Sequence, residues 1–249
     1  MADGSGLCAM CNKPGTMTCG GCHCSRYCSG DCQKLDWPVH KLLCKTFRDF
    51  ETRPGNKFKR AIYFPVSGTG PKFIWLQFEG YDLEDKPYYE QPVYGTLLGE
   101  DKPATERVFI DENMIVRRNL AHTIILAVRS TFVYDGSLPN KSVAKVDEEL
   151  GYQWKGSFVA LGMKGIRQEP RVSDDLGTTD FRHIVDELRI QHYFNFSRPY
   201  ENVQGEKVKG VRINCLGDQG IFGRPEFEAV DCQLYFSKSI PRGVPYSMF

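Results

Sequence analysis

The chain has 249 residues, of which 41% are hydrophobic and 25% are charged. This composition is typical of globular proteins and supplies enough apolar material for a core. The 32 Lys and Arg residues nearly balance the 31 Asp and Glu residues, so no overall field attracts nucleic acid or anionic lipid. No apolar run approaches the roughly 20 residues needed to span a bilayer, and the first residues lack the basic and apolar regions of a secretory signal.

Cysteines are concentrated at one end of the chain. Eight of the ten lie within residues 8–44, and only Cys215 and Cys232 follow. A secreted disulfide-rich protein usually spreads its bridges through the whole structure, whereas a local cluster is typical of a metal module in a reducing compartment. We therefore expect an intracellular protein of the cytosol or nucleus, in which the sequons at Asn140 and Asn195 carry little weight.

The cluster is built from four pairs of metal-binding residues. They are Cys8-x2-Cys11, Cys19-x2-Cys22, Cys28-x3-Cys32 and His40-x3-Cys44. A two-residue gap lets both sulfurs converge on one tetrahedral ion, and a three-residue gap puts two ligands on one face of a helical turn. Asp36 is predicted to cap the helix that carries His40, with Pro38 in its first turn. Eight ligands in four pairs predict two tetrahedral sites.

The ligand types identify the metal as zinc. Seven thiols and one imidazole favour zinc over calcium or magnesium, which prefer oxygen. An iron–sulfur cluster and a disulfide knot are the competing interpretations; two closed tetrahedra use all four pairs, and a reducing compartment disfavours disulfides. Because protein ligands close both sites, the two zinc ions are expected to be structural. Cys24 could replace Cys22 as a ligand, but we expect it to be a non-ligating, partly shielded thiol.

This segment resembles a MYND-type zinc finger. The residues that carry the resemblance are Cys8, Cys11, Cys19, Cys22, Tyr27, Cys28, Cys32, Gln33, Trp37, His40 and Cys44. The spacing alone leaves a sequential pairing of the ligands open. The resemblance implies a cross-braced pairing, with Cys8, Cys11, Cys28 and Cys32 on one zinc and Cys19, Cys22, His40 and Cys44 on the other.

The resemblance also implies a kind of partner. Similar fingers bind short proline-containing peptides of other proteins, and the matching positions here, Gln33 and Trp37, are expected to form the peptide-binding surface. An exposed indole is suited to stack on a polyproline II segment; the alternative is that Trp37 packs in the finger's own small core. Residues 1–46 carry five Lys or Arg and three Asp or Glu. Seven thiolates make the zinc-loaded finger slightly acidic, which disfavours nucleic acid.

The rest of the chain is predicted to form a larger α+β domain with a mostly β core. We expect the finger at residues 1–46, a linker at 47–58 and this domain at 59–249. Alternating or continuous apolar runs predict strands, and residues 120–128 could instead begin as a helix. The predicted strands lie at 61–66 and 72–79, which form a hairpin, and at 108–116, 123–134, 157–163, 208–218 and 227–236. Residues 174–194 predict one amphipathic helix after a cap rich in Asp and Thr.

Candidate chemistry in this larger domain is sparse. Asp180, His183 and Glu187 would share one helical face, where a metal or acid–base site competes with a solvated surface. His122 is interpreted as an interior residue. The segment from Lys209 to Val230 resembles the tails of fungal MYND-finger proteins to which no activity is attached.

MYND fingers also occur inside lysine methyltransferases that have a split SET domain. Those enzymes place SET sequence before the finger, where this chain has seven residues, and their asparagine-rich segment is absent. The sequence therefore predicts a zinc-binding interaction or regulatory protein. The alternative is an enzyme of unassigned class whose active site lies in the larger domain.

Overall fold

The computed structural model of the chain describes residues 6–68, 70–84, 86–99, 103–132, 134–148, 150, 154–164, 170–195, 207–214, 216, 219–220 and 223–233. Contacts divide the chain into two compact units, Met1–His192 and Tyr193–Phe249. The first unit holds both the finger and the large sheet. The boundaries expected from the sequence, with a linker at 47–58, stay a prediction.

The finger consists of a short hairpin and one helix. Strands β1 (Met17–Thr18) and β2 (Arg26–Tyr27) pair antiparallel, and helix α1 follows at Gly30–Cys44. The helix begins earlier than predicted, because Ser29 is its N-cap and accepts a hydrogen bond from the backbone of Cys32. The prediction that Asp36 caps the helix is therefore wrong. Asp36 and Pro38 lie inside α1, and the side chain of Asp36 is buried.

The larger part of the first unit is an antiparallel sheet. Its strands are β3 (Phe58–Phe64), β4 (Lys72–Leu83), β5 (Lys86–Val93), β6 (Thr105–Asn113), β7 (Arg118–Arg129), β8 (Phe158–Lys164) and β9 (Val172–Asp174). Their order is β5-β4-β3-β8-β7-β6, and β9 pairs with β8. The predicted hairpin is confirmed as β3 and β4. The helical alternative for residues 120–128 is wrong, because these residues continue β7.

Helical segments accompany the sheet. Those with described bounds are the 3-10 segment η2 (Phe47–Phe50), α2 (Lys141–Val146) and α3 (Thr178–Asn195). The predicted amphipathic helix is confirmed as α3, whose Phe181, Ile184 and Leu188 are fully buried. The fold is α+β with a mostly β larger part, as predicted. None of the helices in the described ranges is both long and apolar enough to cross a membrane.

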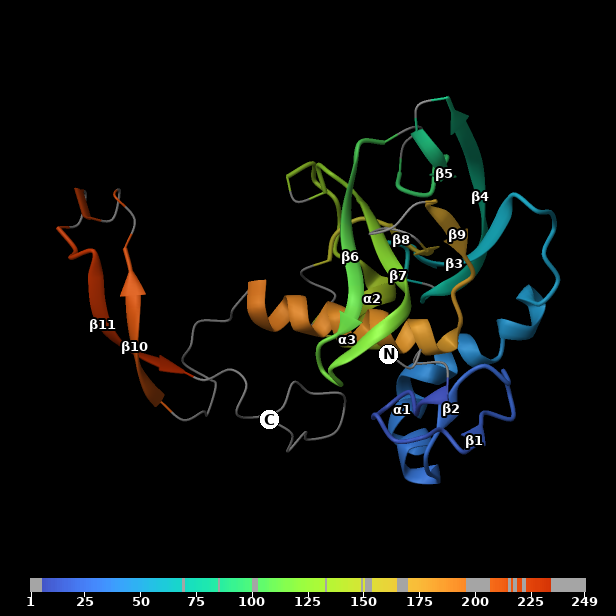
Figure 1. Cartoon of the computed structure of the whole chain (residues 1–249), viewed down its shortest axis with the longest axis horizontal. Coiled ribbons are helices and arrows are strands. Elements are labelled where there is room, and N and C mark those ends of the chain that lie inside the picture. The colour runs from blue at the N-terminus through green and yellow to red at the C-terminus, as the bar shows by residue number, and fades with distance from the viewer. Residues whose placement is uncertain are drawn as a thin grey trace. The chain divides into compact units, whose positions relative to one another are not determined.

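One apolar cluster runs without a break from the finger through α3 to the sheet. It includes Cys8 and Cys44 of the finger, Phe181 of α3, and Phe64 and Phe158 of the sheet. The last two rings stack with their centroids 4.3 Å apart. Figure 1 shows the first turns of α3 between the sheet and the finger. The finger is therefore packed on the sheet through α3.

The second unit contains a separate hairpin. Strands β10 (Lys207–Ile213) and β11 (Phe227–Gln233) pair antiparallel, with Ile213 opposite Phe227. The strands predicted at 208–218 and 227–236 are confirmed over 208–213 and 227–233, residues 214 and 216 lie outside the strand, and the remaining predicted positions lie outside the described residues. Cys215 and much of the surrounding glycine-rich stretch lie outside the described residues.

Candidate metal centres

The first metal centre, called site 1, joins the start of the finger to the start of α1. Cys8 and Cys11 flank the turn at residues 9 and 10. Cys28 precedes the helix cap, and Cys32 lies in the first turn of α1. The Sγ of Cys28 is 3.6 Å from that of Cys11 and 3.5 Å from that of Cys32. All four sulfurs lie within 4.8 Å of one another, so they can bind a single ion.

The second centre, called site 2, is buried more deeply. Its residues are Cys19, Cys22, His40 and Cys44, all of which are buried. The Nε2 of His40 lies 3.3 Å from the Sγ of Cys19 and 3.6 Å from that of Cys22. The sulfurs of Cys19 and Cys44 are 3.6 Å apart. Nε2 is thus the ring nitrogen of His40 that faces the metal position.

These distances fit zinc. A tetrahedron with Zn–S bonds near 2.3 Å has sulfurs about 3.8 Å apart, and a sulfur and an imidazole nitrogen about 3.5 Å apart. The separations in both centres agree with these values to within a few tenths of an ångström, and the cysteines of the finger are free of disulfides. The two clusters therefore fit two zinc ions in a cross-braced finger, as the resemblance implied. Four protein ligands close each site, which makes the zincs structural.

Hydrogen bonds prepare Cys22 to bind the metal as a thiolate. Burial opposes ionisation of Cys22, whereas the hydroxyl of Thr178, 3.3 Å from its Sγ, can donate to the thiolate. In site 1, the backbone N–H of Met10 donates to the Sγ of Cys8 over 3.4 Å. Such donors to sulfur stabilise the deprotonated ligands that zinc requires.

The predicted peptide-binding residues lie one turn apart on α1. The side chain of Trp37 is 43% exposed, and Gln33 is half-buried. The indole ring lies beside the imidazole of His40, with the ring centroids 6.1 Å apart and the planes tilted by 43°. Trp37 therefore packs against His40, a zinc ligand, while much of its surface stays exposed to solvent.

The other candidates from the sequence are not brought together as a site. On α3, Asp180 contacts His122, and Glu187 accepts a hydrogen bond from Gln191. His183 bonds to Asn113 instead, over 2.9 Å. Among the described residues, the two Cys/His clusters of the finger are the groups arranged for a metal, and Cys24 belongs to neither.

Sequence reasoning did not find the surroundings of His122. Its Nδ1 lies 2.9 Å from Asp174, and its Nε2 forms an ion pair at 3.3 Å with Asp180. The partners come from β9 and α3, more than fifty positions later in the chain. No local spacing could have indicated this contact, because it depends on the tertiary fold.

Comparisons with known proteins agree with this geometry. The family described as MYND finger matches residues 8–44. Ubiquitin carboxyl-terminal hydrolase 19 of Arabidopsis thaliana is 42% identical over 55 residues, which are 22% of this chain and 8% of that protein. Tudor domain-containing protein 1 of Oryzias latipes is 45% identical over 41 residues, 16% of this chain and 4% of that protein.

A third relative is the N-lysine methyltransferase SMYD2 of Rattus norvegicus, 46% identical over 39 residues, which are 16% of this chain and 9% of that protein. The chain therefore spans less than a tenth of the length of each of these three proteins. No solved structure matches the chain. The resemblance of the later residues to fungal proteins stays a prediction. The family match and the two converging ligand sets together show that the chain carries a MYND-type zinc finger at residues 8–44.

Proposed function

We propose that this protein is an intracellular interaction protein, of the cytosol or nucleus, whose finger recruits partners through short proline-containing segments. The finger with its two zinc sites is a zinc-binding interaction module. The finer assignment rests on the surface around Gln33 and Trp37. The eight cysteines of the finger form no disulfides, which supports a reducing compartment.

The observation that carries the proposal is the exposed indole of Trp37 on a fixed helix. His40 and Cys44 attach the same helix to site 2, one and two turns after Trp37. A rigid aromatic side chain loses little entropy when it binds, and a polyproline II segment is already ordered. Asp36, about 100° away around the same helix, is buried and contacts Arg182 of α3, whereas Trp37 is exposed. The Trp37 side thus remains available to a partner.

The experiment compares two exposed apolar residues of the same helix. Leu35 is 39% exposed, nearly as much as Trp37, but two positions along a helix it points to almost the opposite side. We would pass a displayed library of peptides centred on proline, and a matched library with alanine in its place, over the immobilised full chain.

The full chain should enrich the proline library at micromolar affinity. Trp37→Ala should weaken the selected peptides by about thirtyfold, the effect of losing about 2 kcal/mol, while Leu35→Ala should leave them unchanged. Both variants should retain two zinc ions. Equal enrichment of the two libraries would refute the proposal, and loss of zinc from Trp37→Ala would show that this indole belongs to the core of the finger.

A further inference from the structure

Site 2 has polar neighbours that come from far along the chain. Thr178, the first residue of α3, places its Oγ1 3.3 Å from the Sγ of Cys22, 156 positions away. The same hydroxyl lies 2.7 Å from the hydroxyl of Ser25. Both side chains are buried, at 1% and 0% exposure. A hydroxyl of the helix is therefore in hydrogen-bond contact with a metal ligand.

The metal fixes the direction of these hydrogen bonds. A zinc-bound thiolate has no proton, so Cys22 accepts and Thr178 donates. The hydroxyl of Thr178 can then accept the proton of Ser25, and Ser25 in turn accepts from Thr179 over 3.3 Å. Hydrogen bonds in such a chain polarise and strengthen one another. This series of hydrogen bonds runs from Thr179 on α3 through Ser25 and Thr178 to Cys22, a zinc ligand.

A second contact from α3 reaches the other side of site 2. Asp36 lies 3.9 Å from the Nδ1 of His40, the ring nitrogen that points away from the metal position. This separation is longer than a hydrogen bond, and Nδ1 has no hydrogen-bond partner among the described residues, so the carboxylate acts on the imidazole through its charge. Asp36 accepts a hydrogen bond from Tyr27 over 2.7 Å, and the guanidinium of Arg182 lies 3.4 Å away. Arg182 on α3 thus balances the charge of the carboxylate that faces the zinc-binding imidazole.

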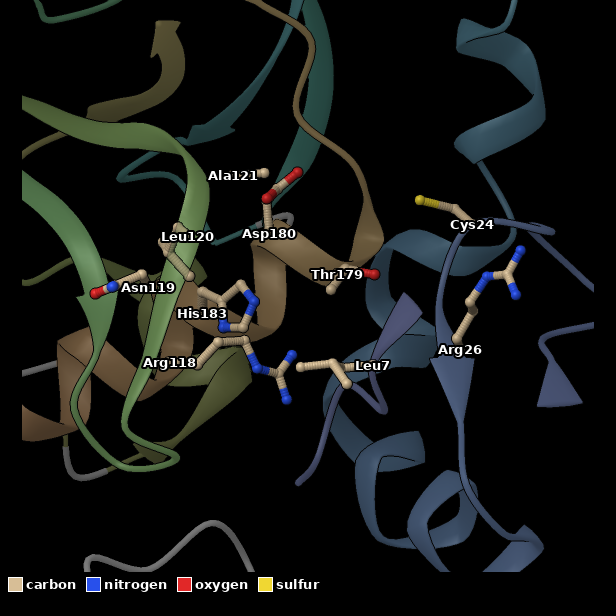
Figure 2. A pocket seen from close by; sticks show the side chains of 10 residues that line it. All are labelled: Leu7, Cys24, Arg26, Arg118, Asn119, Leu120, Ala121, Thr179, Asp180 and His183. Carbon is tan, nitrogen blue, oxygen red and sulfur yellow. The ribbon is translucent and has the colours of Figure 1, made fainter. Parts of the chain in front are cut away.

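The contact between α3 and the finger borders a small pocket. Figure 2 shows Thr179 and His183 of α3 on one side and Cys24 and Arg26 of the finger on the other. The cavity has a volume of about 140 Å³. Thr178 and Arg182, which precede Thr179 and His183 in the chain, are buried, so the hydrogen bonds to site 2 are shielded from solvent.

The two metal sites differ in how they are connected to the rest of the fold. At site 1, Arg118 of β7 donates to the backbone oxygens of Cys8 and Cys11, over 2.7 and 2.6 Å. These bonds hold the backbone of the knuckle and do not touch a ligand sulfur. At site 2 the hydroxyl of Thr178 contacts the ligand atom of Cys22 itself. A change in α3 should therefore affect site 2 more than site 1.

We propose that α3 completes the outer shell of site 2, with Thr178 as a positioning residue for the Cys22 thiolate and Arg182 as the counter-charge for Asp36. Zinc retention at this site then depends on the docking of α3. By thermodynamic reciprocity, zinc at site 2 favours the docked helix to the same extent. Site 1 retains its zinc independently of these two side chains.

The test compares two substitutions at one position. Thr178→Val keeps the shape of the side chain but removes the hydroxyl, and Thr178→Ser restores the hydroxyl. Thr123→Val is the matched control, since Thr123 is also buried and its hydroxyl bonds to Asp111 in the sheet. Zinc release from the full chain to a chromogenic chelator would be followed, with circular dichroism as the check on folding.

Thr178→Val should lose one of its two zincs about tenfold more readily, in line with the effect of outer-shell partners on metal affinity. The second zinc should be released as in the unaltered chain. Thr178→Ser should restore retention, and Thr123→Val should not change it. If Thr178→Val releases both ions as the unaltered chain does, or if both sites weaken equally, the proposal is wrong.

A spectroscopic readout separates positioning from general stability. With Co²⁺ in place of zinc, loss of a hydrogen bond to sulfur raises the energy of the thiolate electrons, so the sulfur-to-cobalt band should move to lower energy in Thr178→Val and return in Thr178→Ser. Should Thr178→Val fail to fold, Ser25→Ala removes the next hydroxyl from the finger side. Ser25→Ala should weaken zinc retention at one site by a smaller, few-fold amount. An unchanged zinc release profile would overturn the proposal.

Discussion

Cys24 is the cysteine of the finger that belongs to neither ligand set. Because both sites are complete without it, Cys24→Ser should retain two zinc ions per chain, measured by metal analysis of the purified protein. The matched change Cys22→Ser should lose the ion of site 2. If Cys24→Ser lost one zinc instead, the assignment of Cys22 as a ligand would be wrong.

The side chain of Cys24 leaves no room for a side chain at Gly177. A Cβ at this position would lie 2.6 Å from the Sγ of Cys24, closer than non-bonded atoms approach. Gly177→Ala should therefore lower the free energy of unfolding by about 1–3 kcal/mol, the usual effect of overpacking. Cys24→Ala removes the sulfur, so the double variant should recover most of this loss in a denaturant titration. Equal losses in the single and double variants would place the cause elsewhere.

His122 holds a charge inside the fold. Burial opposes protonation, but Asp174 and Asp180 outweigh it and raise the pKa of the imidazole to about 10. Burial likewise opposes the charge on Asp174, whose pKa is nevertheless lowered to about 2 by His122 and by Lys164, 3.2 Å away. The three elements β7, β9 and α3 are thus joined by one cation between two carboxylates.

The stability of this group should depend on pH in a defined direction. The raised pKa of His122 stabilises the fold fully below about 6.5, its value in the unfolded chain, and this contribution is lost as the pH rises toward 10. The lowered pKa of Asp174 stabilises the fold above about 4, and that contribution is lost as the pH falls toward 2.

We therefore expect His122→Gln to cost a few kcal/mol of unfolding free energy at pH 5.5 and clearly less at pH 9.5. Urea titrations of both proteins at the two pH values, with zinc present, measure the difference, so that any pH effect on the zinc sites is shared. A cost that does not change between these pH values would show that the imidazole is neutral in the folded protein.

At the level of elements, α3 is attached to its neighbours by buried charge. Arg182 is 1% exposed and donates to Asp186 over 2.7 Å as well as contacting Asp36. Removing the cation leaves two buried carboxylates without its charge, although Asp36 keeps the hydrogen bond from Tyr27 and Asp186 keeps the one from Asn113. Arg182→Ala should lower the free energy of unfolding by about 3–5 kcal/mol.

An exposed ion pair provides the comparison for Arg182. Arg53 lies 2.5 Å from Asp175, but its side chain is 36% exposed, and surface pairs contribute about 1 kcal/mol or less. When the thermal unfolding of both variants is compared with that of the unaltered chain, Arg53→Ala should therefore have a small effect. Similar losses for the two arginines would mean that the buried network around Asp36 contributes no more than a surface contact.

The elements differ in how far the sequence could predict them. Ligand spacing predicted two metal sites, because the ligands are grouped in short pairs, and the resemblance to MYND fingers implied which pairs share an ion. Apolar periodicity predicted α3, and alternation predicted β3 and β4, because burial of one face leaves a local pattern. The cap of α1 was assigned wrongly to Asp36, since a charged residue next to a helical pattern is a common capping signal. The partners of Asp36 are Tyr27, nine positions earlier, and Arg182, 146 positions later in the chain.

Other elements were also missed. Strand β5 contains two prolines and two charged residues, Lys86 and Glu90, a composition that is unusual in strands, and it forms because β4 is available to pair with it. Helix α2 has six residues, too few to show a period. The sequence could therefore predict what depends on local spacing, while the contacts between finger, α3 and sheet required the fold.

At the level of the whole molecule, the finger and the sheet share their core in the first unit. The apolar cluster includes zinc-site cysteines together with residues of α3 and the sheet. Arg118 of β7 donates to two backbone oxygens of the finger, and the amide of Asn12 donates to the backbone of Val116. Unfolding of the finger would break these hydrogen bonds, which is costly for a buried charge. The finger and the elements beneath it should therefore open together.

Removal of zinc should show how far this coupling extends. In hydrogen–deuterium exchange of the full chain, a strong chelator should remove protection from α1 and also from the start of α3 and the start of β7. The centre of β7 and β8 should stay protected, because residues such as Ile125 and Leu161 pair within the sheet and lie in a second apolar cluster away from the finger. The control is the same chelator saturated with zinc. Loss of protection confined to the finger would mean that it folds independently of the sheet, and loss throughout the chain would mean that zinc supports the entire fold.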